Sequence, residues 1–180
     1  MNRETPQLLF DSMVVDYLMA AMQGSYHPDD DRDENLRDQR VAAYRLFLCA
    51  DVAIAPTAST QIMNTPNQEK RKALDKLVSI HFLEPQIPEE LLNRTRARAA
   101  DLVQYHSDER DCLIVAEAEI LGFDAVVTFD RKMRRRLAER ARVAILSPIE
   151  ALDRIGIVKK SPRKRPAQGN PNSQETWWRE

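Results

Sequence analysis

The stretch that decides the fold runs from Asp111 to Asp130 and reads DCLIVAEAEILGFDAVVTFD. Its first half places Ile114, Val115 and Ala118 at offsets of three, four and seven from Asp111, which is the spacing of one helix face. Its second half is a short apolar run that stops at an acid, which is typical of a buried strand. The stretch therefore predicts a helix, a turn and a strand, with an aspartate at each end.

A third aspartate, Asp11, occupies the same kind of position. It comes directly after the apolar run at residues 7–10, as Asp130 comes directly after the run at 125–129. Ligands of open α/β sheets bind just beyond the carboxyl ends of the strands. We therefore expect the carboxylates of Asp11, Asp111 and Asp130 to converge in one pocket, where they would form a divalent-metal site.

The rest of the chain predicts an α/β alternation. Strands are expected at residues 7–10, 52–55, 125–129 and 143–146, with a short edge strand at 82–87. Helices are expected at residues 13–23, 36–49, 57–63, 67–81, 88–105, 132–140 and 149–155, and one opens near Asp111 with Ser107 as its N-cap. Residues 1–158 form one domain with an acidic loop at 25–34, and residues 159–180 form a basic tail predicted to be disordered.

Composition limits the class of protein. The chain has 180 residues and 43% hydrophobic content, enough for one domain with a core. It has no long apolar run and no signal pattern, so a cytoplasmic protein without a membrane partner is expected. Its four glycines form no phosphate loop. The histidines lack metal-ligand spacing, and His106 is expected to be structural or exposed. Cys49 and Cys112 are expected to be buried free thiols.

The net charge of −1 conceals a segregation of charge. A basic cluster follows Asp130 directly and would lie beside the predicted site. Guanidinium groups there suit a phosphate backbone, although a solvated helix face explains the same pattern. The candidate RNA-binding residues are Arg131, Arg134, Arg135 and Arg136. Two aromatic residues in the tail, Trp177 and Trp178, could stack on bases, and an unstructured end is the simpler reading.

In order along the chain, these pieces resemble the PIN domain family of metal-dependent ribonucleases, which includes toxins of toxin–antitoxin pairs. The most specific piece is the helix that opens with Asp111, the turn at Gly122 and the strand that leads to Asp130. Asp11 and Ser12 resemble the family's opening strand and its Asp-Ser/Thr pair. Residues 145–152 resemble its closing strand, proline and helix.

The resemblance implies a three-layer α/β/α sandwich around a mainly parallel sheet. It implies hydrolysis of single-stranded RNA with Mg²⁺ or Mn²⁺ held by Asp11, Asp111 and Asp130. Three carboxylates can suffice for Mg²⁺, which keeps several of its waters. The partners that it allows are RNA, an antitoxin-like protein and a second copy of the chain in a homodimer.

One position departs from the family pattern. Gln61 stands where the family usually places a glutamate, and its loss of charge lowers the expected affinity for a hard cation. Ser12 and Thr128 are expected to orient the flanking carboxylates, or else to satisfy local backbone groups. The acids that could replace the missing glutamate are Asp16, Asp108, Glu117 and Asp124.

Two classes of function therefore remain open. The first is a PIN-type ribonuclease, and the second is a catalytically degenerate PIN domain that binds RNA or protein without cutting. Each aspartate taken singly is also a suitable helix cap or first-turn acid. A phosphatase of the haloacid dehalogenase type would need a second aspartate two residues after Asp11, where Met13 stands.

Overall fold

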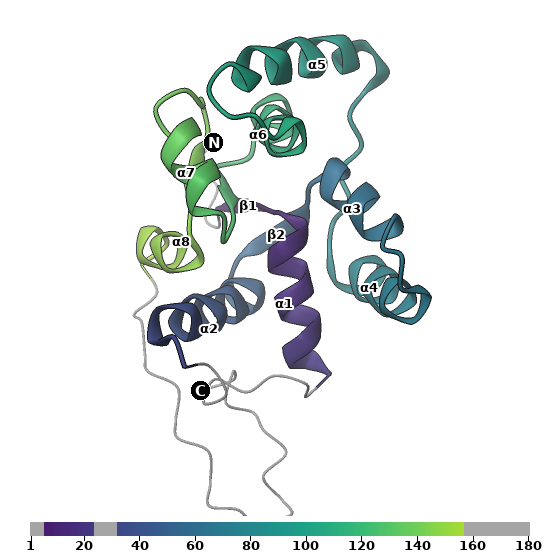
Figure 1. Cartoon of the computed structure of the whole chain (residues 1–180), viewed down its shortest axis with the longest axis vertical. Coiled ribbons are helices and arrows are strands. Elements are labelled where there is room, and N and C mark those ends of the chain that lie inside the picture. The colour runs from purple at the N-terminus through teal and green to yellow at the C-terminus, as the bar shows by residue number, and fades with distance from the viewer. Residues whose placement is uncertain (1–5, 24–31, 157–180) are drawn as a thin grey trace, which may run out of the picture.

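The computed structural model describes residues 6–23 and 32–156 (Figure 1). Most of the predicted acidic loop lies outside the described residues. So does the whole predicted tail, with Trp177 and Trp178. None of the helices in the described part of the chain is long and apolar enough to cross a membrane.

A four-stranded sheet lies at the centre, and all of its strands are parallel. The strand order is β2-β1-β3-β4, and the strands are β1 (Gln7–Phe10), β2 (Asp51–Ile54), β3 (Ala125–Val127) and β4 (Ala144–Leu146). β1 pairs with β3 so that Phe10 is opposite Val127. The two strands therefore end level with each other, and the residues that follow them emerge at the same edge of the sheet.

Eight helices connect and cover the strands in the described part of the chain. They are α1 (Ser12–Met22), α2 (Glu34–Cys49), α3 (Pro56–Met63), α4 (Gln68–His81), α5 (Glu89–Val103), α6 (Glu109–Leu121), α7 (Arg131–Leu137) and α8 (Pro148–Arg154). α5 packs along α6, α2 packs along α8, and α4 packs against α1 and α3. The predicted α/β/α sandwich with a parallel sheet is confirmed.

The sheet forms the centre of the hydrophobic core. Leu8, Leu9 and Phe10 of β1 are at most 2% exposed, and the β3 residues are equally buried. Parallel strands covered by helices on both faces need apolar residues at successive positions, because both faces are away from water. That requirement explains why the continuous apolar runs before Asp11 and Asp130 form strands.

Three local predictions were wrong. No strand forms at residues 82–87 within the described structure, where Leu83 makes only an isolated parallel bridge to Ala53. The N-cap of α6 is Asp108 rather than Ser107, and its carboxylate accepts the N–H groups of the first turn. Cys49 is exposed, because it ends α2 at the surface, whereas Cys112 is buried as predicted.

Candidate active site

Asp11 lies at the junction of β1 and α1. It is the N-cap of α1, where its Oδ1 accepts a hydrogen bond from the backbone N–H of Val14 at 2.9 Å. Its Oδ2 accepts a hydrogen bond from the hydroxyl of Thr128. The residue is only 8% exposed. Asp11 therefore serves as a cap, and its second oxygen faces the neighbouring strand.

Thr128 connects the two acids that follow β1 and β3. Its hydroxyl donates to the carboxylate of Asp11 and accepts the backbone N–H of Asp130 at 2.9 Å. The side chain is fully buried. The hydroxyl thus fixes the distance between two segments that are more than a hundred residues apart in sequence.

Asp130 is the N-cap of α7. Its Oδ1 accepts backbone N–H groups from Lys132 and from Met133, the latter at 2.9 Å. Two N–H groups at a helix start favour a negative charge at this position. The same carboxylate therefore caps α7 and belongs to the candidate site. Its other oxygen, Oδ2, accepts no hydrogen bond from the described residues.

Asp111 is held by a histidine that the sequence did not connect with the site. His106 is buried at 5% exposure, and its Nε2 lies 2.7 Å from Oδ2 of Asp111. Its Nδ1 is buried and has no partner among the described residues. An unpartnered acceptor costs less than an unpartnered N–H, so the geometry favours the tautomer in which Nε2–H donates to Asp111.

Burial and mutual repulsion act on these carboxyl groups. Burial raises the pKa of Asp11 from 3.8 to about 6, and the negative charges of Asp111 and Asp130 add to the increase. Hydrogen bonds from Thr128 and Val14 oppose it. The charges of Asp111 and Asp130 therefore act on Asp11, which follows β1 at the carboxyl edge of the sheet.

The pKa of Asp111 is also raised. Burial is the main cause, and the charges of Asp108 and Asp130 contribute, while the hydrogen bond from His106 opposes the change. Like charges that are crowded in this way cost stability unless a cation or a proton compensates them. A divalent cation bound among them would remove that cost.

The donor set fits a hard cation in its chemistry, because carboxylate oxygens are the ligands that Mg²⁺ and Mn²⁺ prefer. The carboxylates are, however, farther apart than the ligands of a bound cation. Among the described residues, no three histidine, cysteine, aspartate or glutamate side chains come close enough to form a metal-binding group. A cation bound by Asp11, Asp111 and Asp130 would have to draw these carboxylates together or reach some of them through water.

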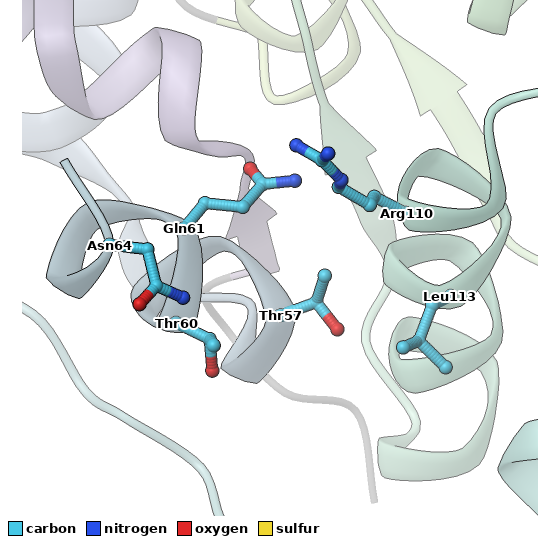
Figure 2. A pocket seen from close by; sticks show the side chains of 6 residues that line it. All are labelled: Thr57, Thr60, Gln61, Asn64, Arg110 and Leu113. Atoms are coloured by element: carbon cyan, nitrogen blue, oxygen red, sulfur yellow. The ribbon is translucent and has the colours of Figure 1, made fainter. Parts of the chain in front are cut away.

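Gln61 directs its carbonyl oxygen to Ser12, the residue that follows Asp11. Its Oε1 accepts a hydrogen bond from the hydroxyl of Ser12 at 2.7 Å. Its amide nitrogen points across a pocket toward Arg110 (Figure 2). In this arrangement Gln61 presents a hydrogen-bond donor, and Ser12 orients Gln61 rather than a carboxylate.

The four acids considered as replacements for the missing glutamate have other partners. Asp16 forms an ion pair with a lysine of α4, and Asp108 caps α6. Asp124 accepts a backbone N–H at the start of β1, which is the opposite edge of the sheet. Glu117 is buried and accepts both the backbone N–H and the hydroxyl of Thr57 at the start of α3. Burial raises the pKa of Glu117, and these bonds oppose the change.

The arginines of α7 differ in their surroundings. Arg131, Arg135 and Arg136 are exposed and have no ion pair with any side chain in the described part of the chain. Arg134 lies 2.8 Å from Glu150 of α8, and its side chain is 21% exposed. Three of the four predicted RNA-binding arginines are therefore available to a ligand, and the fourth has a structural partner.

Comparisons with known proteins leave the family open. No protein-family model matches the sequence, and no curated protein matches it. Among solved structures, the chain is similar to the crystal structure of FitAcB from Neisseria gonorrhoeae, with 15% identity and a TM-score of 0.42. The alignment covers 79% of this chain and 98% of that chain. A likeness of this size leaves the function to be argued from the site.

Proposed function

We propose that this protein is a PIN-type ribonuclease that hydrolyses single-stranded RNA with Mg²⁺ or Mn²⁺. The observation that supports it most is that Asp11, at the carboxyl edge of a parallel sheet, lies close enough to Asp111 and Asp130 for their charges to raise its pKa. Edges of this kind are where α/β proteins bind ligands. Neither the fold nor any single cap requires three repelling carboxylates there.

In this proposal, Asp11, Asp111 and Asp130 hold the cation directly or through water. A divalent ion in such a site activates a water for attack on the phosphodiester and stabilises the charge on the leaving oxygen. The hydroxyl of Thr128 keeps the carboxylate of Asp11 in position, and His106 does the same for Asp111. The exposed arginines of α7 follow Asp130 directly and would contact the RNA backbone.

The proposal predicts metal-dependent cleavage by the purified chain. End-labelled single-stranded RNAs should be cut with Mn²⁺ or Mg²⁺ and left intact with EDTA. The Asp130→Asn variant should be inactive and folded, because asparagine caps helices as well as aspartate does. Circular dichroism checks the fold. Cleavage that persists in the Asp130→Asn protein would point to a contaminating nuclease or to another site.

Neutralising the exposed arginines of α7 should weaken RNA binding and its dependence on salt. We expect the combined variant with glutamine at positions 131, 135 and 136 to lower the slope of log Kd against log salt by about 0.7 for each lost phosphate contact. Arg134→Gln is the matched control, because its guanidinium is paired with Glu150. Fluorescence anisotropy in EDTA measures both. Equal slopes in the control and combined variants would show that α7 does not contact the RNA.

A second function is supported by Gln61. Its carbonyl oxygen is bonded to Ser12, and no three-ligand group forms among the described residues, so a domain that binds RNA without cutting it is the alternative. RNA binding without metal-dependent cleavage would select this alternative.

A toxin role, with an antitoxin-like partner, is part of the same proposal. Whether the neighbouring reading frame encodes a small antitoxin-like protein tests it. Cell fractionation tests the proposed cytoplasmic location, and light scattering tests the proposed homodimer.

A further inference from the structure

A pocket of about 680 Å³ lies between α3 and α6 (Figure 2). All but one of the residues that line it carry a polar side chain, and none of them is a carboxylate. The residues that line it are Thr57, Thr60, Gln61, Asn64, Arg110 and Leu113. The volume is within the range of about 300–1,000 Å³ that small-molecule sites occupy.

Two hydrogen-bond donors face each other across this pocket. The Oε1 atom of Gln61 is occupied by Ser12, which leaves the amide NH₂ directed at the guanidinium of Arg110. Arg110 is exposed and has no ion pair with a described residue. An acceptor with negative charge between the two groups would satisfy both of them.

The remaining walls offer an apolar surface and a free amide. Leu113 faces the pocket from α6, and Asn64 faces it from the end of α3, with no hydrogen bond from its side chain to a described residue. The nearby hydroxyls already donate, that of Thr57 to Glu117 and that of Thr60 to a backbone carbonyl. The apolar side chain of Leu113 and the amide of Asn64 would suit the face and the polar edge of a nucleic-acid base.

The two donors are tied to two of the three acids. Ser12, which orients Gln61, follows Asp11 directly, and Arg110 directly precedes Asp111. A phosphate between Gln61 and Arg110 would therefore belong to a nucleotide beside the bond to be cut. No acid lines the pocket, so no carboxylate of its wall competes with the phosphate for these two donors.

We propose that this pocket binds one nucleotide of the single-stranded RNA, with a phosphate between the Gln61 amide and the Arg110 guanidinium and the base beside Leu113 and Asn64. This inference rests on the proposed function, because it takes RNA as the substrate. It assigns the pocket to the substrate. It also makes Gln61 a hydrogen-bond donor to a phosphate rather than a metal ligand.

Binding of labelled oligonucleotides in EDTA tests the proposal without any cleavage. Arg110→Gln should weaken the binding of a fluorescein-labelled oligouridylate by roughly tenfold or more, the usual effect of losing a hydrogen bond to a charged group. Arg94→Gln is the matched control, because Arg94 is an exposed arginine of α5 that does not line the pocket. It should leave the affinity unchanged.

A second pair of measurements separates the base from the phosphate. Asn64→Ala should change the ratio of affinities for oligouridylate, oligocytidylate and oligoadenylate, whereas Arg110→Gln should lower all three alike. Circular dichroism confirms that each variant is folded. Equal affinities of wild type and Arg110→Gln for all three RNAs would overturn the nucleotide site, and the pocket would then be available to a peptide partner.

Failure of this inference is distinguishable from failure of the proposed function. If the wild type cuts RNA with Mn²⁺ while Arg110→Gln and Asn64→Ala bind and cut as wild type does, the nucleotide site is overturned and the ribonuclease stands. If Arg110→Gln binds RNA more weakly but no protein cuts with any metal, the ribonuclease fails and the nucleotide site is supported. If wild type binds no RNA, both are overturned.

Discussion

Replacing Asp11 with asparagine should abolish RNA cleavage and, with a chelator present, make the folded protein more stable above pH 6. Both effects have one cause, because the substitution removes a negative charge that is buried and repelled by two neighbours. A bound cation needs that charge, and the metal-free fold is destabilised by it. We expect cleavage to fall by about a thousandfold or more, as losses of an essential electrostatic group do.

The sign of the stability change follows from the pKa of Asp11. Its ordinary value is 3.8, and burial raises the pKa to about 6 in the folded protein. The folded state therefore keeps a proton that the unfolded state loses, and stability from this group declines as pH rises from about 4 to above 6. Asparagine never ionises, so Asp11→Asn should gain on the order of 1–3 kcal/mol at pH well above 6.

Local geometry should tolerate this substitution. Asparagine is as good an N-cap as aspartate, and its carbonyl oxygen can still accept the N–H of Val14. Its NH₂ would face the hydroxyl of Thr128, which has one lone pair left to accept it beside the bond from the backbone N–H of Asp130.

Urea denaturation at several pH values, in EDTA, measures the stability difference directly. The difference between variant and wild type should shrink toward zero as pH falls to about 4. Met13→Leu is a suitable control, since Met13 is exposed beside the site and carries no charge. A constant difference at all pH values would assign the effect to packing, and full cleavage by Asp11→Asn would remove Asp11 from the site.

Much of this site follows from sequence because its parts are local. A parallel strand buried on both faces must be continuously apolar, so both strands before Asp11 and Asp130 could be predicted from the sequence alone, although β3 ends at Val127, two residues before its predicted end. The helix that contains Asp111 could likewise be predicted from the spacing of its apolar residues. The level ends of β1 and β3 then place Asp11 and Asp130 at one edge without further information.

The parts that sequence did not predict depend on contacts between distant segments. The bond between Ser12 and Gln61 spans 49 residues, and that between Thr57 and Glu117 spans 60. No periodicity encodes such pairs. The expected strand at residues 82–87 failed for a related reason, because its fate depended on pairing with β2, and Pro85 cannot donate to a ladder. The role of His106 had a signal, since it lies five residues before Asp111, but burial was needed to interpret it.

His106→Leu should reduce cleavage by about tenfold to a hundredfold, the usual cost of losing a group that orients a metal-binding side chain. Leucine fills a similar volume but cannot donate to Asp111, so this half-buried carboxylate would lose its bond from Nε2. That bond opposes the rise in the pKa of Asp111, and its loss should raise the pKa further. The KM for RNA should change little, because neither the α7 arginines nor the pocket between α3 and α6 is altered.

His106→Gln is the matched control, because its side-chain NH₂ reaches close to the position of Nε2 and can donate to Asp111. It should recover most of the activity and most of the Mn²⁺ dependence, whereas His106→Leu should need more Mn²⁺ for half-maximal cleavage. Equal losses in both variants would mean that His106 acts through packing alone. Wild-type activity in His106→Leu would show that Asp111 needs no positioning. Activity that recovers in His106→Gln but not in His106→Leu would identify His106 as the residue that positions Asp111. The two variants differ chiefly in whether they present a hydrogen-bond donor to its carboxylate.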